Sequence, residues 1–205
     1  MTTTTNMSHP FSILQKWTAI LLCTAGLMGC AGSRYGLEAA SCSSASVDAR
    51  ALEFKVADAR GVAAADRADL SVPKQLEAGA SKRVPVGLTT AFKIEAARQL
   101  SEMADGDGAT LQVVAEVENA VVAWSTQAEG KVAKVTVDLT FSVYDDSGNL
   151  VQRGSVSSTG ELSADDASPE ELTAAVDATA LNAVAKYWAR DKTVAGLNEA
   201  VGGQG

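Results

Sequence analysis

The clearest pattern in the sequence is a strict alternation of apolar and polar residues over residues 132–144. Apolar side chains occupy every second position, and polar ones such as Thr136, Thr140 and Tyr144 lie between them. This two-residue period predicts a β-strand with one packed face and one wet face. Because a one-residue slip would expose the whole apolar row, we expect the register of this strand to be tightly specified.

Shorter alternations predict further strands on both sides of this one. Residues 52–58 predict an early strand that ends at Asp58-Ala59-Arg60. Residues 111–124 predict a second, with a bulge near Asn119 that changes which side chains face inward. Residues 150–162 predict the last strand of a three-stranded meander. The loops of this meander fall at residues 127–130 and 145–149, which are rich in turn-forming residues.

Two stretches have the helical period instead. In the first, Thr89 or Thr90 can cap the start, and residues 105–108 end it. In the second, Ser168 can cap the start with Glu171 completing a capping box. The apolar positions that define the first helix are Leu88, Phe92, Ala96, Leu100 and Met103, and those of the second run from Leu172 to Trp188.

The order strand, helix, three meandering strands, helix predicts an α+β fold. A sheet with one wet face and two helices with one apolar side each are most simply combined as a two-layer sandwich. We therefore predict about four strands in a mostly antiparallel sheet, with two helices packed on one face. We assign this domain to residues 51–192 and interpret residues 193–205 as a flexible tail. Residues 61–87 predict a long loop, with a short strand near residues 83–86.

The N-terminal region contains a short apolar run that follows Lys16 and ends at Leu27-Met28-Gly29-Cys30. The run is too short to span a bilayer, so it predicts a signal peptide over residues 1–29. A leucine three residues before a cysteine, with glycine just before it, resembles the bacterial lipobox. The resemblance implies that Cys30 is acylated and becomes the mature N-terminus, followed by a flexible Ser/Ala/Gly tether over residues 30–50.

The alternative is an ordinary secretory leader, which would leave Cys30 as an incidental thiol. In either case translation can start at Met1 or at Met7. Several acyl chains, palmitate among them, would hold the protein to a membrane more durably than one. By analogy with enteric lipoproteins, Ala31 favours the outer membrane, with the domain facing the periplasm. The inner membrane and the cell surface are the alternatives.

Charge and residue usage exclude several kinds of function. The formal net charge is −8, so binding to a nucleic-acid backbone, which needs clustered cations, is not expected. The single histidine, His9, lies in the predicted leader, so the mature chain has no histidine for catalysis or metal binding. With Cys30 lipidated, Cys42 has no partner for a disulfide. We predict that Cys42 is an exposed thiol on the tether.

Other polar and aromatic groups carry weaker signals. The acidic loops 105–108 and 145–149 do not match a calcium-binding loop and are interpreted as turns. Asp66 with Asp69, and Asp165 with Asp166, are interpreted as solvated charges. We predict no catalytic residue, no metal site and no cofactor. Four aromatic residues could line a groove, although core packing is the simpler interpretation; these are Trp124, Tyr144, Tyr187 and Trp188.

The element order, together with Val56-Ala57-Asp58-Ala59-Arg60 after the first strand and the helix from Thr90, resembles the YajG family of bacterial envelope lipoproteins. The resemblance covers roughly Ala51 to Lys192. It implies an envelope lipoprotein and brings no established enzymatic activity with it. Similar layouts occur in lipoproteins of lipopolysaccharide assembly, in auxiliary lipoproteins of lipid-transport ABC systems and in activators of penicillin-binding proteins.

The leading hypothesis is a membrane-tethered, non-enzymatic module that docks an envelope protein through its open sheet face or an edge strand. The alternative is a carrier of a lipid or another hydrophobic ligand, acting as an auxiliary lipoprotein of an ABC-type or lipopolysaccharide transport system. A carrier requires an apolar cavity beneath the helix that begins near Thr90. An enzyme would require a site of serine or carboxylate groups that the sequence does not reveal.

Overall fold

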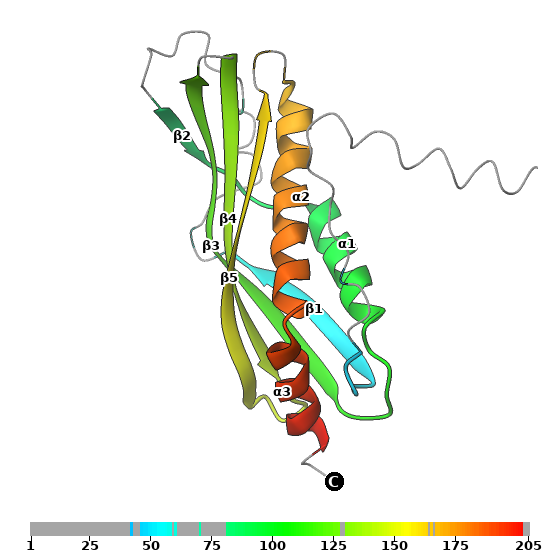
Figure 1. Cartoon of the computed structure of the whole chain (residues 1–205). Coiled ribbons are helices and arrows are strands. Elements are labelled where there is room, and N and C mark those ends of the chain that lie inside the picture. The colour runs from blue at the N-terminus through cyan, green and yellow to red at the C-terminus, as the bar shows by residue number, and fades with distance from the viewer. Residues whose placement is uncertain are drawn as a thin grey trace, which may run out of the picture. The chain divides into compact units, whose positions relative to one another are not determined.

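Strand β4 (Gly130–Tyr144) lies inside a five-stranded mixed sheet, and helices cover one face of that sheet (Figure 1). The computed structural model describes residues 42, 46–58, 60, 70, 81–127, 130–163, 165 and 167–202. All of them belong to one compact unit, Tyr35–Gly205. The predicted α+β fold, with helices packed on a single face of a mostly antiparallel sheet, is confirmed.

The strand order is β1-β3-β4-β5, with β2 paired to β3 beside β1. Strand β1 (Ala51–Ala57) runs parallel to the first half of β3 (Thr110–Gln127), and β2 (Ser81–Pro85) runs antiparallel to its second half. The long β3 is therefore shared by two short edge strands. The short strand expected near residues 83–86 is confirmed as β2. The sheet therefore has five strands among the described residues, where about four were predicted.

Strands β3, β4 and β5 (Leu150–Ser163) form the predicted meander. The bulge expected near Asn119 is confirmed, because the register between β3 and β4 shifts between Val117 and Asn119. The side chain of Asn119 donates from Nδ2 to Asp138 Oδ2 at 3.0 Å across the two strands. The apolar row of β4 is fully buried on the helix-facing side, as its alternation predicts.

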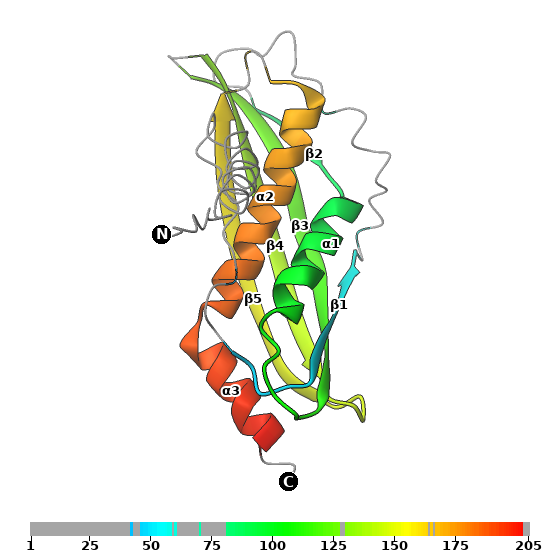
Figure 2. The same ribbon diagram turned by 90° about the vertical axis from the view of Figure 1, so that its right-hand side faces the viewer.

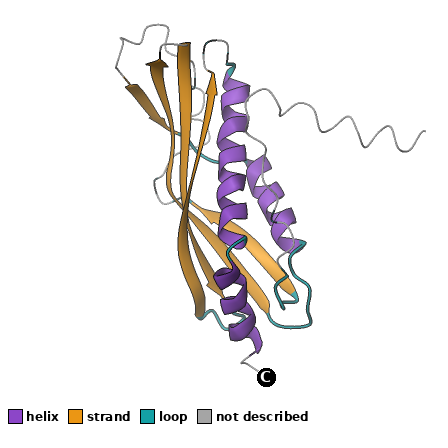
Figure 3. Ribbon diagram, viewed as in Figure 1, coloured by secondary structure: helices purple, strands orange, loops and turns teal. Residues whose placement is uncertain are grey.

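Helices α1 (Thr90–Ser101), α2 (Pro169–Trp188) and α3 (Asp191–Gly202) form the second layer (Figures 2 and 3). Both predicted caps are confirmed: Thr89 Oγ1 accepts the Phe92 N–H at 3.0 Å, and Ser168 forms the capping box with Glu171. The N–H and the hydroxyl of Thr89 also donate to the Asp177 carboxylate. This contact joins the start of α1 to the middle of α2.

Helix α3 corrects the prediction of a flexible tail over residues 193–205. Residues 193–202 are helical, and residues 203–205 lie outside the described residues. Thr193 and Leu197 are buried, and Val194 and Val201 pack against the core. The apolar positions 194, 197 and 201 have helical spacing, which was the available signal. The polar and glycine-rich residues around them obscured it.

The end of the predicted tether also belongs to the domain. Val47 and Ala49 are fully buried, and the Val47 N–H donates to the Met103 carbonyl at 2.9 Å. The Asp48 N–H donates to Asn198 Oδ1 on α3 at 2.9 Å. A Cβ at Gly108 would lie 2.5 Å from the Asp48 carbonyl oxygen, a backbone atom, which explains why glycine is needed there. The boundary predicted at residue 50 was therefore placed too late in the chain.

The core between the two layers is filled by large side chains. Phe141 of β4 stacks on Tyr187 of α2 with 4.4 Å between ring centroids, and Trp188 meets both rings edge-on. Trp124 is fully buried beneath the helices. Three of the four aromatic residues that could have lined a groove are thus core residues, as the simpler interpretation holds.

Candidate functional site

The predicted lipidation motif, Leu27, Met28, Gly29 and Cys30, lies outside the described residues, as do Asp66, Asp69 and Asp166. Asp165 is described, and both of its carboxylate oxygens accept the Lys131 N–H at 3.2 Å. Among the described residues, no three His, Cys, Asp or Glu side chains gather to hold a metal ion. No helix in the described part of the chain is both long and apolar enough to cross a membrane.

The loop at residues 145–149 uses its acid to form a turn. Asp145 Oδ1 accepts the N–H groups of Ser147 at 2.9 Å and Asn149 at 2.8 Å. Gly148 adopts a φ of 79°, the left-handed conformation that glycine tolerates best. Beside this turn, Gln112 and Tyr144 line a groove of about 390 Å³. The groove lies beside the hairpin turn, and of the two acids in its lining Asp145 is already occupied by backbone donors, whereas Asp146 adds a single carboxylate.

Cys42 differs from its prediction as an exposed thiol. The residue is half-buried against the core, and its N–H donates to Gln99 Oε1 on α1 at 3.3 Å. Burial raises the pKa of the Cys42 thiol to about 11. The thiolate is the reactive form of cysteine, so this group is a poor nucleophile at neutral pH.

The Asp58-Ala59-Arg60 motif, which carries much of the family resemblance, has a structural role. The Arg60 guanidinium donates to the Ala120 carbonyl at 3.2 Å and the Val86 carbonyl at 3.0 Å, and pairs with Asp58 at 2.8 Å. It therefore joins the end of β1 to β3 and to the residue after β2. The hydrogen bonds from Arg60 hold the pKa of Asp58 below its usual value, although partial burial opposes the shift.

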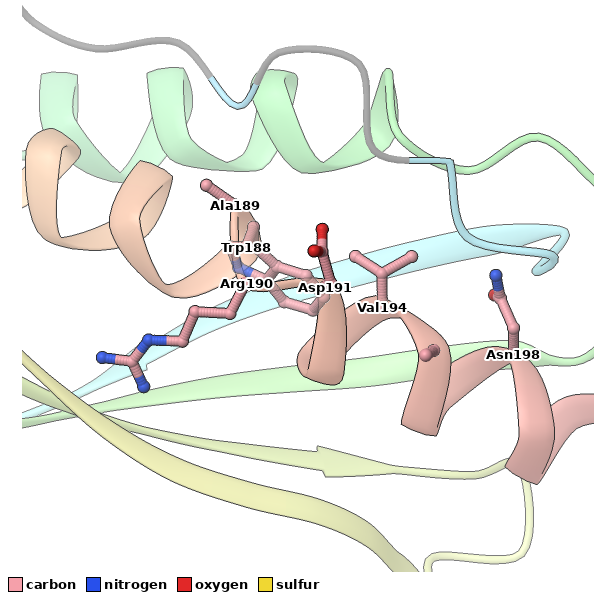
Figure 4. Close-up of a pocket in the computed structure, with 7 residues that line it drawn as sticks. Trp188, Ala189, Arg190, Asp191, Val194 and Asn198 are labelled. Atoms are coloured by element: carbon pink, nitrogen blue, oxygen red, sulfur yellow. The ribbon is translucent and has the colours of Figure 1, made fainter.

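A pocket of about 300 Å³ lies where α2 meets α3 (Figure 4). Val194 and Asn198 line it from α3, but the Asn198 amide already bonds the backbone of residues 46 and 48. Figure 4 shows Arg190 extending away from both residues. The pocket therefore has no convergent set of free polar groups, whereas Arg190 points to a different part of the surface.

The face of the sheet away from the helices is less wet than its alternation predicts. Arg153 of β5 reaches across β4 and pairs with Glu116 of β3 at 3.1 Å. Thr140 and Ser142, which lie between those two strands, are only 6% and 3% exposed. Thr136 and Tyr144 remain half-exposed. The ion pair thus covers the centre of the face, where an exposed threonine was expected.

The outer edge of β5 is the most distinctive polar surface of the domain. Strand β5 ends the strand order, so its outer side has no strand partner among the described residues (Figure 1). In an antiparallel ladder, the backbone groups of alternate residues point away from the neighbouring strand. The Ser155 carbonyl points outward, because it accepts from Arg190 Nη1 at 3.2 Å. By this alternation the outward set is Arg153, Ser155, Ser157, Thr159, Glu161 and Ser163.

Two cations lie along this edge, Lys186 in α2 and Arg190 just after that helix. Lys186 Nζ donates to Ser158 Oγ at 3.2 Å on the helix side of β5, and Arg190 caps the Ser155 carbonyl. The Arg190 guanidinium also lies 5.8 Å from the centre of the Tyr187 ring. In the described part of the chain, neither cation has a carboxylate within salt-bridge distance. The helix side of this edge is therefore locally positive in a chain whose net charge is −8.

Arg190 also borders a shallow groove on the open face of the sheet. The groove has a volume of about 500 Å³, and its charged lining consists of Glu118, Asp138 and Arg190. The hydroxyls of Thr140 and Ser155, 2.9 Å apart, form part of its floor. Both acids lie on the open face, opposite the helix side where Lys186 lies. The two sides of the β5 edge therefore differ in charge.

No family model matches the chain, and no curated protein matches its sequence. A solved structure, protein XCC0632 from Xanthomonas campestris, carries the family model DUF330. It is similar over 78% of this chain and 86% of its own, with 16% sequence identity and a TM-score of 0.36. At this score and identity, the likeness shows nothing about what the chain does.

Proposed function

We propose that the chain is a non-enzymatic interaction module of the bacterial cell envelope that docks a partner protein by strand addition at the β5 edge. The observation that carries the proposal is the outer side of β5, a strand of 14 residues that has no strand partner on this side among the described residues. Outward N–H and C=O groups on such an edge are a template for an added strand. Strand β5 contains neither proline nor lysine, which commonly block edges.

The packing of the two layers supports docking over the carrier alternative. A carrier needs an apolar cavity beneath α1, but the α1 side chains that face the sheet are closely packed. Phe92, Ala96 and Leu100 are at most 1% exposed, and Phe54 meets Phe92 with 6.4 Å between ring centroids. The three pockets at Val194, Thr140 and Tyr144 have no α1 residue in their lining.

The membrane anchor in this proposal is lipid on Cys30, at the outer membrane, with the domain in the periplasm. Because Cys42 already contacts α1, at most the 11 residues between Cys30 and Cys42 can act as the tether in this proposal. Such a segment spans roughly 40 Å at full extension. The domain would work close to the bilayer, and its partner is expected within that distance.

The anchor is tested by labelling cells with an alkyne analogue of palmitate and measuring label on the purified protein. Cys30→Ser should remove the label, whereas Cys42→Ser should retain it, since only the first lies in the lipobox. Mass spectrometry of the mature N-terminus gives an independent measurement. An unacylated terminus in the native chain, or equal labelling of both variants, would contradict the anchor.

The docking edge is tested by photo-crosslinking in intact cells, with a photoreactive amino acid at Thr159, whose side chain is exposed on β5. The control places the same amino acid at Ile94, an exposed position on α1 with 66% exposure. We expect a reproducible crosslinked envelope protein from Thr159 and not from Ile94. Ser157→Pro, which removes one outward N–H, should reduce this crosslink at least tenfold. Absence of a crosslink at Thr159 would count against docking at β5.

A further inference from the structure

We propose that the segment docking on β5 is an extended acidic stretch of the partner protein, recognised by Lys186 and Arg190. This inference rests on the proposed function and specifies the chemistry of its partner. The carrying observation is a pair of cations, Lys186 in α2 and Arg190 just after it, beside an unpaired strand edge. Neither cation has a carboxylate partner in the described part of the chain. Charge complementarity of this kind gives an interface its specificity.

Arg190 acts at the backbone of the edge. In the unbound chain its guanidinium satisfies the outward Ser155 carbonyl. An added strand would supply a backbone N–H to that carbonyl and would displace the guanidinium. The displaced guanidinium, which is exposed in the unbound chain, would then be free to take a new partner from the incoming strand. A carboxylate on the incoming strand supplies that partner, and a bidentate pair with arginine is among the strongest charge-assisted contacts.

The side on which the carboxylates lie follows from the surrounding charges. Lys186 lies on the helix side of β5, above Ser158. On the open face, Glu118 and Asp138 line the groove, and Glu161 projects from β5 itself. Acidic side chains of the added strand are therefore favoured on the helix side and disfavoured on the open face. Because alternate residues of a strand share a face, they should lie two or four positions apart.

A second copy of this chain fits the edge less well. Antiparallel pairing of two β5 strands would bring Lys186 and Arg190 of both copies to one seam, and like charges across an interface are unfavourable. The charged groups of β5 offer little compensation, because they are already paired within the chain. Arg153 contacts Glu116 at 3.1 Å, and Glu161 contacts Lys134 at 3.7 Å.

The test uses the full-length chain with the photoreactive amino acid at Thr159, in cells. Lys186→Glu combined with Arg190→Glu should reduce the crosslink at least tenfold. The matched control is Lys55→Glu with Lys93→Glu, which changes the net charge by the same amount at two exposed lysines away from β5. This control should retain the crosslink within about twofold. Both double variants are checked for folding by circular dichroism and thermal unfolding. The crosslinked peptide, sequenced by mass spectrometry, should contain carboxylates two or four residues apart.

The outcomes separate this inference from the proposed function. If Ser157→Pro removes the crosslink but reversal of Lys186 and Arg190 does not, docking at β5 stands and acidic recognition is wrong. Acidic recognition is also overturned if the crosslinked peptide lacks carboxylates. The same holds if that peptide comes from a second copy of the chain or from elsewhere in the same chain. If the chain gives no crosslink at Thr159, both proposals fail.

Discussion

The two edges of the sheet are built in different ways. One edge consists of β1 and β2, strands of seven and five residues, and it contains Lys55, Lys82, Arg83 and Pro85. The other edge is β5 alone, with 14 residues and neither lysine nor proline. Short strands, lysine and proline are the features with which proteins discourage edge-to-edge pairing. The first edge is therefore protected by its sequence, whereas β5 keeps its capacity to pair.

The arginine contacts at the two edges also differ, and they too leave the second edge more able to pair. At the first edge, Arg60 binds the carbonyls of Ala120 and Val86 and forms an ion pair with Asp58, which closes the gap between β1 and β2. At the second, the Arg190 guanidinium donates to the Ser155 carbonyl at 3.2 Å. The first arginine is held by three groups and is structural. The second is held by one backbone carbonyl and by its contact with the Tyr187 ring, and it can be displaced from the carbonyl.

The largest effect is expected from proline substitutions along β5. Ser158→Pro should destabilise the fold by about 3 kcal/mol or more, because its N–H points towards β4 and proline removes a ladder hydrogen bond. Ser157→Pro, one residue away, should cost roughly 1 kcal/mol, since its N–H points outward and no ladder hydrogen bond is lost. Urea unfolding followed by circular dichroism measures both. Equal losses for the two variants would show that the outward set of residues is wrongly assigned.

The next effect is expected at the opposite edge. Arg60→Ala should destabilise the domain by about 2 kcal/mol, because it leaves two carbonyls and Asp58 without their donor. Arg83→Ala is the matched control, since Arg83 is an exposed cation on β2 and should change stability by less than about 0.5 kcal/mol. Comparable losses for both variants would mean that Arg60 does not clamp this edge.

The same clamp predicts how stability depends on pH. The pKa of Asp58 is lowered in the folded chain from its ordinary value of 3.8. The unfolded chain therefore binds more protons than the folded chain as the pH falls below about 4. The contribution of Asp58 to stability is present above that pH and is lost as the pH drops through its folded pKa. In urea titrations at stepped pH, Arg60→Ala should show a shallower loss of stability than the native chain over this window.

The smallest effect on stability, and the sharpest contrast between the edges, is expected from removing the blocking residues of β2. Lys82→Thr, Arg83→Thr and Pro85→Thr together should change stability by less than about 1 kcal/mol, because all three side chains are exposed. The triple variant should nonetheless self-associate more than the native chain, as measured by light scattering after size exclusion. An unchanged monomer fraction would indicate that these residues do not protect the edge.

Elements with strong local signals could be predicted from the sequence. The alternation of β4 and the capping box at Ser168 each involve residues within a few positions of one another. Thr89 at the start of α1 and the bulge at Asn119 are of the same kind. Such features depend on backbone geometry and on which side chains avoid water. A linear pattern contains that information.

The missed features depend on contacts between distant residues. The Asp48 N–H and Asn198 are 150 positions apart, and their bond ties the end of the presumed tether to α3. Cys42 and Gln99 are 57 positions apart, and burial at that contact sets the state of the thiol. Neither Cys42 nor the residues around Asp48 belong to a stretch with a strong hydrophobic period. Each acquires its structure from the surface against which it packs.

The amino-acid sequence by itself determined the α+β class, the meander and the starts of α1 and α2, because these follow from local periodicity and capping. Only the tertiary structure decided that the chain after Arg190 is helical, that the open face is crossed by an ion pair, and that β5 ends the sheet. Strand order and charge pairing arise when segments far apart in the chain meet. The candidate docking edge is therefore a property of the assembled sheet.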